Sequence, residues 1–258
     1  MLLQGQRVLI TGASRGIGRA TAIECARHGA DIGLNVFKDP EATASLVKEI
    51  EALGRKVVVF DGDVADADNA EAFIEAGVKG LGGVDTFVSN AGICPFHSFL
   101  DMPRNVMRRT TNVNYEGAWF MCQAAANQMV KQGRDSEGRG GQIIAISSIS
   151  ALVGGEMQTH YTPTKAAVHS LMQSAAIALG KHGIRCNSVM PGTIATDINK
   201  EDLADDAKRE YMEKRIPLGR LGKPEDIANV VIFLASYLSG YVTGASVLTD
   251  GGMFVNLQ

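Results

Sequence analysis

The sequence predicts an α/β protein with one doubly wound parallel sheet flanked by helices. Short apolar segments alternate with amphipathic helical segments along the whole chain, a glycine-rich turn follows the first apolar segment, and polar residues follow several others. The 258 residues suffice for one large core, and no repeat or low-complexity stretch divides them. We therefore expect a single domain over residues 1–258.

The apolar pattern places each element in turn. Seven strands are expected at residues 7–10, 31–37, 56–60, 84–89, 142–147, 185–189 and 246–249. Helices are expected up to about residue 28, over 41–53, 67–81, 107–130, 161–181 and 197–215, and from residue 224 onward. The polar segment at about 193–215 is expected to form a lid over a site at the carboxyl ends of the strands.

The composition excludes several classes of function. The net charge is −3 with no basic tract, so nucleic-acid binding is not expected. No apolar run approaches the roughly 20 residues of a membrane span, and the first residues lack the pattern of a signal peptide. The four cysteines and five histidines have no metal-ligand spacing, so we expect no metal, reduced thiols and a cytoplasmic protein.

The glycine-rich turn predicts a dinucleotide site in a Rossmann-type fold. Gly12, Gly16 and Gly18 stand between the first strand and the first helix, with the spacing G-x-x-x-G-x-G. Glycines let a ligand approach the backbone, and the helix N-terminus offers N–H groups and a positive dipole end to a pyrophosphate. A glycine-rich turn alone is a weak signal, but its position after the first strand favours cofactor binding.

The end of the second strand indicates which dinucleotide is preferred. An acidic residue at this point is typical of NAD binding, but no carboxylate occurs there before Asp39. Arg15 and Lys38 are instead two cations suited to a 2′-phosphate. We therefore expect NADP as the preferred cofactor with NAD tolerated; the alternative is that both cations are solvated surface charges.

A tyrosine and a lysine four residues apart are the candidate catalytic pair. Tyr161 and Lys165 fall one turn apart on the same face of a helix, and Pro163 fits the first turn of that helix. A nearby ammonium favours the phenolate, so Lys165 is expected to lower the pKa of Tyr161 and fit it for general acid–base catalysis. Taken alone, such a pair also occurs by chance on solvated helices.

Polar residues at the strand ends converge on the same edge of the sheet. Gly12, Asp63, Asn90 and Ser148 each follow the end of an expected strand. Ligands of open parallel sheets bind at the carboxyl ends of the strands. A cofactor and substrate site is therefore expected along this edge.

These stretches together resemble the short-chain dehydrogenase/reductase family over almost the whole chain. Ser148 and Tyr161 stand thirteen residues apart, and no catalytic position is missing. The matching residues are Thr11 to Gly18, Asp63-Val64, Asn90-Ala91-Gly92, Asn114, Ser148, Tyr161-x-x-x-Lys165, Pro191-Gly192 and Asp250-Gly251-Gly252.

The resemblance implies the catalytic roles. Tyr161 exchanges a proton with the substrate oxygen, and Ser148 hydrogen-bonds the same oxygen. Lys165 lowers the pKa of Tyr161 and holds the nicotinamide ribose. Asn114 holds a water that links Lys165 to solvent. The alternatives to Ser148 are Ser147 and Ser150, and the alternative to Asn114 is Asn112.

The resemblance also implies the cofactor contacts. Asp63 and Val64 would surround the adenine, although Asp63 could merely cap the following turn. Ile194 and Thr196 would contact the carboxamide. The full expected set is Gly12, Ser14, Arg15, Ile17, Lys38, Asp63, Val64, Asn90, Ala91, Gly92, Tyr161, Lys165, Pro191, Gly192, Ile194 and Thr196.

The expected substrate pocket combines an apolar wall with hydroxyl and amide groups. Cys94, Pro95, Phe96 and Phe99 would form the wall. This mixture favours a polyol with one apolar corner, such as a deoxysugar, and the chain resembles the sugar 1-dehydrogenases of the family, which oxidise a C1 hydroxyl to a lactone. The expected substrate residues are Ser148, Ser150, Gln158, Tyr161, Thr193, Asn199 and Phe99.

Two other functions compete with a sugar dehydrogenase. A 3-oxoacyl-carrier-protein reductase has nearly the same motifs and needs a basic patch to dock an acidic carrier. The candidate arginines are Arg104, Arg108 and Arg109, or Arg134 and Arg139. A cofactor sensor without turnover is the other alternative, and the intact catalytic set argues against it.

The resemblance implies a homotetramer of 222 symmetry. Small residues on the helices expected at 107–130 and 161–181 could pair across a two-fold axis. The pattern alone equally allows these residues to face the chain's own sheet. The partners expected are therefore a small sugar and further copies of this chain, with neither nucleic acid nor membrane.

Overall fold

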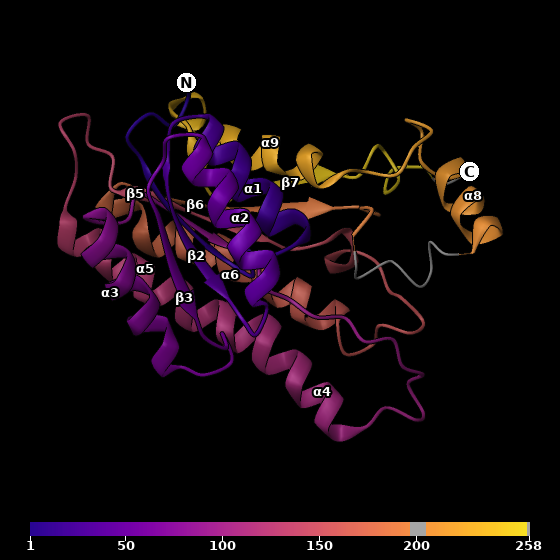
Figure 1. The fold of residues 1–258 in the computed structure, drawn as a ribbon. Coiled ribbons are helices and arrows are strands. Elements are labelled where there is room, and N and C mark those ends of the chain that lie inside the picture. Colours follow the sequence, from indigo (N-terminus) through magenta and orange to yellow (C-terminus); the bar gives the residue numbers. More distant parts are fainter. Residues whose placement is uncertain (197–204, 257–258) are drawn as a thin grey trace.

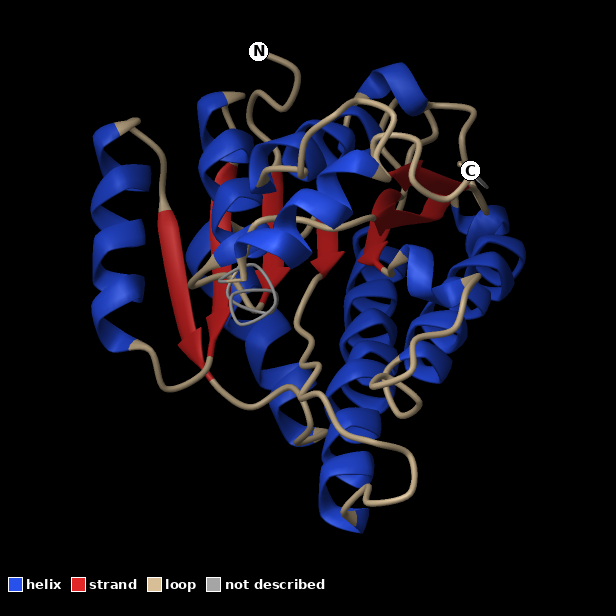
Figure 2. Cartoon of the chain, turned by 90° about the vertical axis from the view of Figure 1, so that its right-hand side faces the viewer, coloured by secondary structure: helices blue, strands red, loops and turns tan. Residues whose placement is uncertain are grey.

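The computed structural model describes residues 1–196 and 205–256 and contains one seven-stranded sheet, shown in Figures 1 and 2. The sheet order is β3-β2-β1-β4-β5-β6-β7, and each neighbouring pair is parallel. This confirms the predicted doubly wound parallel sheet. The strands are β1 (Arg7–Thr11), β2 (Asp31–Val36), β3 (Val57–Asp61), β4 (Thr86–Ser89), β5 (Gly141–Ile146), β6 (Ile184–Pro191) and β7 (Ser246–Thr249).

The helices alternate with the strands, as the pattern predicted. The α-helices are α1 (Gly16–Arg27), α2 (Pro40–Ala52), α3 (Asp68–Leu81), α4 (Arg104–Thr111), α5 (Gly117–Gln132), α6 (Thr162–Leu179), α8 (Asp206–Lys214) and α9 (Pro224–Ala235). The described residues also contain four short helices: η1 (Asn112–Glu116), η2 (Ile149–Ala151), η3 (Gly180–His182) and η5 (Tyr237–Ser239).

Two cores, one on each face of the sheet, hold the layers together. Alternate side chains of a strand point to opposite faces, so Val8 and Ile10 pack with α1, α2 and α9, while Leu9 between them packs with α3, α5 and α6. Figure 1 shows these two sets of helices on opposite sides of the sheet. A sheet covered on both faces explains why its strands are almost uniformly apolar.

The chain reverses its winding direction between β1 and β4. From β1 the sheet is built outward through β2 to β3, and after α3 the chain returns to place β4 on the other side of β1. Ligands of such sheets bind in the crevice outside the carboxyl ends of the strands at this point. The glycine-rich turn after β1 and Asn90 after β4 therefore meet where a ligand is expected.

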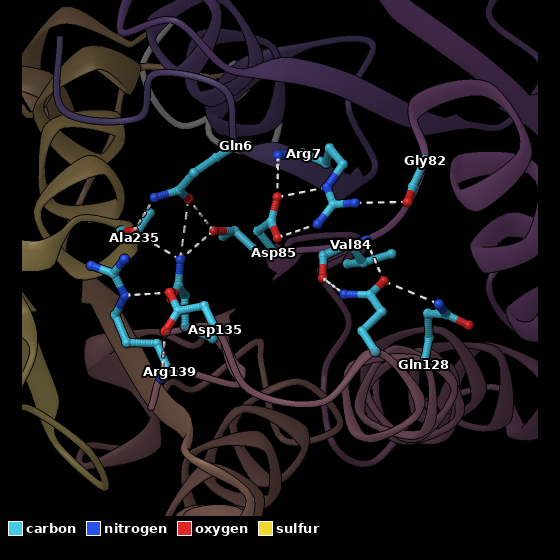
Figure 3. A network of polar contacts seen from close by, with 12 residues as sticks. Gln6, Arg7, Gly82, Val84, Asp85, Gln128, Asp135, Arg139 and Ala235 are labelled. Atoms are coloured by element: carbon cyan, nitrogen blue, oxygen red, sulfur yellow. Dashed lines mark hydrogen bonds and ion pairs between the residues drawn. The ribbon is translucent and has the colours of Figure 1, made fainter. Parts of the chain in front are cut away.

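The amino ends of the strands are tied together by a network of polar side chains, shown in Figure 3. Asp85 accepts hydrogen bonds from the backbone N–H of Arg7 at 2.8 Å and from Nε of Arg7 at 2.7 Å. Gln142 donates to the carbonyl of Ala235 at 2.7 Å, and Gln6 donates to the same carbonyl at 3.2 Å. These bonds fix the amino edge of the sheet and leave the carboxyl edge for ligands.

The long helical stretch predicted over residues 107–130 is present, but it is not α-helical throughout. Residues Asn112–Glu116 form a π-helix between α4 and α5, which inserts an extra residue into the helical turn. Gly117 explains the close approach at this point, because a Cβ there would lie 2.5 Å from the carbonyl oxygen of Val64. The irregular turn also carries Asn114 into the interior, where it is 1% exposed.

The segment expected as a lid is described only in part. Within residues 193–215, the structure contains α8, which starts after Asp205; the carboxylate of Asp205 accepts hydrogen bonds from two backbone N–H groups of the first turn. The start of the helix predicted at residue 197 lies outside the described residues, and its second half is present as α8. Asn199 also lies outside the described residues. A lid and a single domain stay predictions.

Candidate active site

Tyr161 stands at the very start of α6, where the chain enters the helix from a turn. The carbonyl of Gln158 accepts hydrogen bonds from the N–H groups of Tyr161 and Thr162, each at 2.9 Å. Lys165 donates its backbone N–H to the carbonyl of Tyr161 at 3.2 Å, which sets the two side chains one turn apart. Pro163 lies in the first turn, as the sequence predicted.

Lys165 is buried beside the tyrosine ring. Its side chain is 5% exposed, and its Nζ lies 5.6 Å from the centre of the Tyr161 ring. The ammonium donates a hydrogen bond of 2.9 Å to the carbonyl of Ile146, the last residue of β5. Burial lowers the pKa of Lys165 to about 8, and the nearby Cys94 thiol partly opposes that change.

The pKa of Tyr161 moves in the direction opposite to the one predicted from the sequence. Burial raises the pKa of Tyr161, the Cys94 thiol raises it further, and a hydrogen bond with Ser148 only partly offsets both. The spacing of Tyr161 and Lys165 reveals the neighbouring charge but not the burial of the phenol. Burial of Tyr161 therefore favours its neutral phenol.

Ser148 is the serine that contacts the phenol. It follows β5, forms a hydrogen bond with Tyr161, and accepts the N–H of Ser150 at 3.1 Å, which starts the short helix η2. Ser147 is 2% exposed and donates to the carbonyl of Lys165 at 2.8 Å. Of the three serines considered from the sequence, Ser147 is thus a structural link and Ser150 contributes its backbone to Ser148.

Asn114 fastens the π-helix to the loop after β4. Its Oδ1 accepts the N–H of Ile93 at 2.8 Å, and its Nδ2 donates to the carbonyl of Ile93 at 2.9 Å and to Oγ1 of Thr164 at 3.2 Å. Thr164 in turn donates to the carbonyl of Tyr161 at 2.7 Å. Both donors of the Asn114 side-chain amide are used, so Asn114 would act toward a relay water as an acceptor.

Gly92 leaves space above Lys165 and Asn114. A Cβ at this position would lie 3.4 Å from Nζ of Lys165 and 3.5 Å from Oδ1 of Asn114. A Cβ here would make ordinary van der Waals contact with the two polar groups, and a longer side chain would take up space beside them. The glycine fits the expectation that a flat ligand lies against the backbone at this point.

The glycine-rich turn fits the pyrophosphate of a dinucleotide. Gly12 and Gly16 have φ of 63° and 55°, values that favour glycine. Helix α1 begins at Gly16; among the described residues no side chain caps its N-terminus, and its first turn contains no acid. Its first N–H groups and its positive dipole end therefore suit an anion.

Asn90 braces this turn from the neighbouring strand. Its Nδ2 donates to the carbonyls of Thr11 at 2.9 Å and Gly12 at 3.0 Å. Thr11 returns the contact, because its Oγ1 accepts the N–H groups of Asn90 and Ala91. A Cβ on Gly18 would lie 2.6 Å from Nδ2 of Asn90, so this glycine is needed for packing. Asn90 thus holds the shape of the glycine-rich turn, and its side-chain amide donates to the backbone of that turn.

Asp63 is held from both sides at the end of β3. Its Oδ1 accepts the N–H of Ala65 at 3.0 Å, and its Oδ2 forms an ion pair of 2.7 Å with Arg109 of α4. Burial is the largest single influence and raises the pKa of Asp63, but the hydrogen bonds from Arg109 and Ala65 and the charges of Arg109 and Lys38 together lower it below its ordinary value. The capping role considered for Asp63 is therefore present, and Val64 beside it is 7% exposed.

Two cations and a carboxylate meet after β2. Arg15 forms an ion pair of 3.2 Å with Asp39. Lys38 adopts a left-handed conformation with φ of 51°, and its backbone N–H donates to Asp61 at 3.2 Å. Its ammonium lies 5.0 Å from the centre of the Phe37 ring. Arg15, expected at a 2′-phosphate, is thus paired with Asp39, the first carboxylate after the second strand.

The segment at the end of β6 and just after it offers mainly backbone groups to the expected cofactor site. Pro191 is buried as the last residue of β6, and a Cβ on Gly192 would lie 2.6 Å from Cβ of Asp250. Ile194 is 3% exposed and packs in the core, so only its backbone can reach a carboxamide. Thr196 reaches toward the glycine-rich turn, where it would contact a Cβ on Gly16 at 3.4 Å.

A cleft of about 280 Å³ lies between the start of α1 and the start of α9. It is lined by Gly16, Arg19, Ala20, Ile23, Ala195, Thr196, Pro224 and Glu225. The cleft adjoins the anion-binding end of α1. It therefore continues the expected cofactor site toward the segment that begins at residue 193.

Of the residues expected in the substrate pocket, Cys94 and Gln158 lie near the tyrosine. Cys94 is partly exposed and close enough to influence the pKa of both Tyr161 and Lys165. Gln158 packs against Gly155, a Cβ on which would lie 2.7 Å from Oε1 of Gln158. Thr193 points its hydroxyl to the sulfur of Met253 at 3.7 Å. Phe99 is 70% exposed in the loop between β4 and α4.

Several positioning residues could not be recognised in the sequence. Ser147, Thr11 and Thr164 carry no motif that separates them from ordinary strand-end or helix hydroxyls. The group that accepts the hydrogen bond from Lys165 is the backbone carbonyl of Ile146, which a residue of any type would supply. Thr164 lies between Tyr161 and Lys165, and its position in the first helical turn was the one available signal.

Neither a metal-ligand cluster nor a membrane-spanning helix occurs within residues 1–196 and 205–256. No group of three or more His, Cys, Asp or Glu side chains there could hold a metal ion. No helix in the same ranges is long and apolar enough to cross a membrane.

The sheet order, the glycine-rich turn after β1 and the contacts among Ser148, Tyr161 and Lys165 define the class of short-chain dehydrogenases/reductases. The chain belongs to this family, and a family model described as enoyl-(acyl carrier protein) reductase matches residues 12–254.

The chain is also similar to more specific relatives over its whole length. It is 64% identical over 257 residues to the L-rhamnose 1-dehydrogenase (NAD(P)(+)) of Sphingomonas sp. (strain SKA58), covering 100% of this chain and 99% of that protein. It is 59% identical over 261 residues to the enzyme of the same name from Azotobacter vinelandii, covering 100% of both. A crystal structure of a short-chain dehydrogenase from Burkholderia cenocepacia in complex with NADP matches with a TM-score of 0.90 at 33% identity, covering 98% of this chain and 99% of that one.

Proposed function

We propose that the protein is an NAD(P)-dependent dehydrogenase that oxidises the C1 hydroxyl of L-rhamnose to the lactone. The observation that carries the proposal is the full-length similarity to two L-rhamnose 1-dehydrogenases. The arrangement of Ser148, Tyr161 and Lys165 supports the type of reaction, because it places a phenol, a hydroxyl and an ammonium within one small site.

The nicotinamide of the cofactor, when bound, supplies the hydride acceptor. Ser148 orients the sugar hydroxyl through its own hydroxyl, which already faces Tyr161. Tyr161 takes the proton of that hydroxyl and must therefore be deprotonated first, against the burial that raises its pKa. Lys165 is the buried cation beside the phenol and, below a pH of about 8, carries the charge that favours the phenolate.

We propose that the strand ends hold the cofactor in the order in which the sheet presents them. Asp63 and Val64 would contact the adenine, the turn from Gly12 to Ile17 the pyrophosphate, and Arg15 with Lys38 the 2′-phosphate of NADP. What supports this is the uncapped start of α1 and the pair of cations after β2. The remaining contacts would come from Asn90 to Gly92 and from Pro191 to Thr196.

The substrate is recognised by one apolar and several polar groups. The methyl group of a 6-deoxyhexose would pack on Phe99, which has a largely exposed ring available for it. Ser150 and Gln158 would hydrogen-bond the ring hydroxyls. The Thr193 hydroxyl would leave the sulfur of Met253 and hydrogen-bond the sugar from the side opposite Ser150 and Gln158.

An aldose panel tests the proposal. The reduced-nicotinamide absorbance, followed with NADP and then NAD, should rise with L-rhamnose and much less with D-glucose. L-mannose differs from L-rhamnose only by a hydroxyl in place of a hydrogen on C6, so Phe99→Ser should reduce the preference for L-rhamnose over L-mannose about tenfold. Leu100→Ser is the matched control, because Leu100 is 90% exposed in the same loop.

The panel also separates the competing acyl reductase. Turnover of an acetoacetyl thioester with NADPH, and none with any sugar, would contradict the proposal. The structure weakens the basic patch that such an enzyme needs, because Arg109 is paired with Asp63 and Arg139 with Asp135 and Glu137.

We infer that the protein works in the cytoplasm as a homotetramer of 222 symmetry. Ala125 and Ala126 pack in the chain's own core, so the small-residue surface predicted from the sequence is narrower than expected. Apolar side chains on α4 and α5 are exposed instead, with Met107 at 47% and Trp119 at 36%. Sedimentation velocity at micromolar concentration should give four times the 27.4 kDa chain mass, and a monomer would contradict the tetramer.

A further inference from the structure

His160 is a buried polar side chain that the proposed reaction does not use. It is 5% exposed, and neither of its ring nitrogens has a hydrogen-bond partner among residues 1–196 and 205–256. Most buried polar groups of proteins are hydrogen-bonded, so each exception calls for an explanation. His160 stands immediately before Tyr161, in the turn where the carbonyl of Gln158 accepts the N–H of Tyr161. The unpaired imidazole therefore adjoins the candidate catalytic tyrosine.

The ring of His160 faces the loop that follows β4. The ring of His97 lies against it, with the two ring centres 6.5 Å apart and the ring planes at 67°. The pKa of His160 is lowered, because burial lowers it most, the backbone of Pro95 raises it as a hydrogen-bond acceptor, and His97 lowers it again. Proline has no backbone N–H, so the group of Pro95 that acts on the imidazole is its carbonyl. The neutral imidazole has one N–H donor and can aim it at this carbonyl.

The same loop carries the expected apolar wall of the substrate pocket, and it is held at two points. Asn114 exchanges hydrogen bonds of 2.8 and 2.9 Å with the backbone of Ile93. The N–H of His97 donates to the carbonyl of Met157 at 3.1 Å. Residues 94–96 span the gap between these two points, so contacts with side chains decide how closely this part of the wall approaches the site.

We propose that His160 is a positioning residue for the sugar, an inference that rests on the proposed dehydrogenase activity. Its ring N–H donates to the carbonyl of Pro95 and holds residues 94–96 in place relative to Tyr161, the next residue in the chain. Hydrogen bonds in active sites are often long until the substrate is bound, and this one shortens when a sugar packs against the wall.

The position of Cys94 explains why this contact matters for the sugar. Cys94 raises the pKa of Tyr161, which places the wall beside the phenol. A wall that moved away from the phenol would widen the space in which the sugar packs. His160 does not touch the reacting atoms, so its effect is on the binding of the sugar rather than on the proton transfer.

The test compares a variant that keeps the ring with variants that keep an N–H donor. His160→Phe retains an aromatic ring against His97 but removes both nitrogens, so it should raise KM for L-rhamnose about tenfold, roughly the loss of one hydrogen bond. The value of kcat, and the NADP dissociation constant measured by calorimetry without sugar, should stay within a few-fold of wild type. His160→Asn and His160→Gln each place an amide N–H near one of the two ring nitrogens, and the variant that matches the donor should restore KM.

Protein stability separates positioning from packing. In His160→Phe an apolar ring replaces two unpaired buried nitrogens, so its melting temperature should equal or exceed that of the wild type. His182→Phe is the matched control, because it makes the same change at a half-buried histidine of η3, before β6 at the amino edge of the sheet, and should leave KM unchanged.

The outcomes distinguish this inference from the proposed function. An unchanged KM in His160→Phe, or a raised KM that neither amide variant restores, would overturn the role of the contact with Pro95 and leave the dehydrogenase proposal intact. A wild-type protein that does not oxidise L-rhamnose would overturn both.

Discussion

Replacing Tyr161 with phenylalanine is expected to lower kcat about a thousandfold and to leave cofactor affinity within a few-fold of wild type. The change removes only the hydroxyl oxygen, and general acid–base catalysis by a positioned side chain contributes typically about 10²–10⁴-fold. The backbone carbonyl of residue 161 still accepts the hydrogen bonds from Thr164 and Lys165, so the start of α6 is retained.

Steady-state kinetics and calorimetry together test this expectation. The loss should appear in kcat, while the cofactor dissociation constant and the melting temperature stay close to wild type. Tyr237→Phe removes the same hydroxyl from a tyrosine that is 64% exposed in η5 and serves as the control. A Tyr161→Phe protein that kept more than about a tenth of the wild-type kcat would contradict the proposed role.

The sheet was predictable because each strand is a separate apolar run. β7 lies where the sequence placed it, and the other strands differ by a few residues at their ends. The doubly wound parallel arrangement was predictable because strands and helices alternate along the sequence. The site edge followed from the same argument, since Gly12, Asn90 and Ser148 all stand just after strands and strand ends are what the apolar pattern locates best.

The contacts within the site were not predictable in the same way. The ion pair between Asp63 and Arg109 joins residues far apart in the chain, and the clamp between Asn114 and Ile93 depends on a π-helix that no residue pattern announces. The pKa of Tyr161 shows the reason most clearly. Sequence spacing gives the distance between neighbouring charges, while burial depends on how loops from other strands pack around them.

Lys165 shows that a functional group can cost stability. Replacing Lys165 with methionine should abolish turnover and raise the free energy of unfolding at pH 7. Burial lowers the pKa of Lys165 from 10.5 to about 8, so folding opposes the charged form that prevails at pH 7. At 1.36 kcal/mol per pKa unit, the penalty is about 3 kcal/mol. The lost hydrogen bond to Ile146 should offset about 1 kcal/mol of the gain.

The pH dependence of that gain identifies its cause. Between pH 8 and 10.5 the unfolded chain binds a proton at residue 165 that the folded chain has released, so the free energy of unfolding of the wild type rises with pH relative to the variant. The advantage of Lys165→Met should therefore be full below pH 8, shrink through this range and disappear above it. Urea denaturation at pH 7, 8.5 and 10 measures it, with Lys181→Met, which removes an exposed lysine, as the control. A constant advantage at all three values would mean that better apolar packing, rather than the buried charge, separates the two proteins.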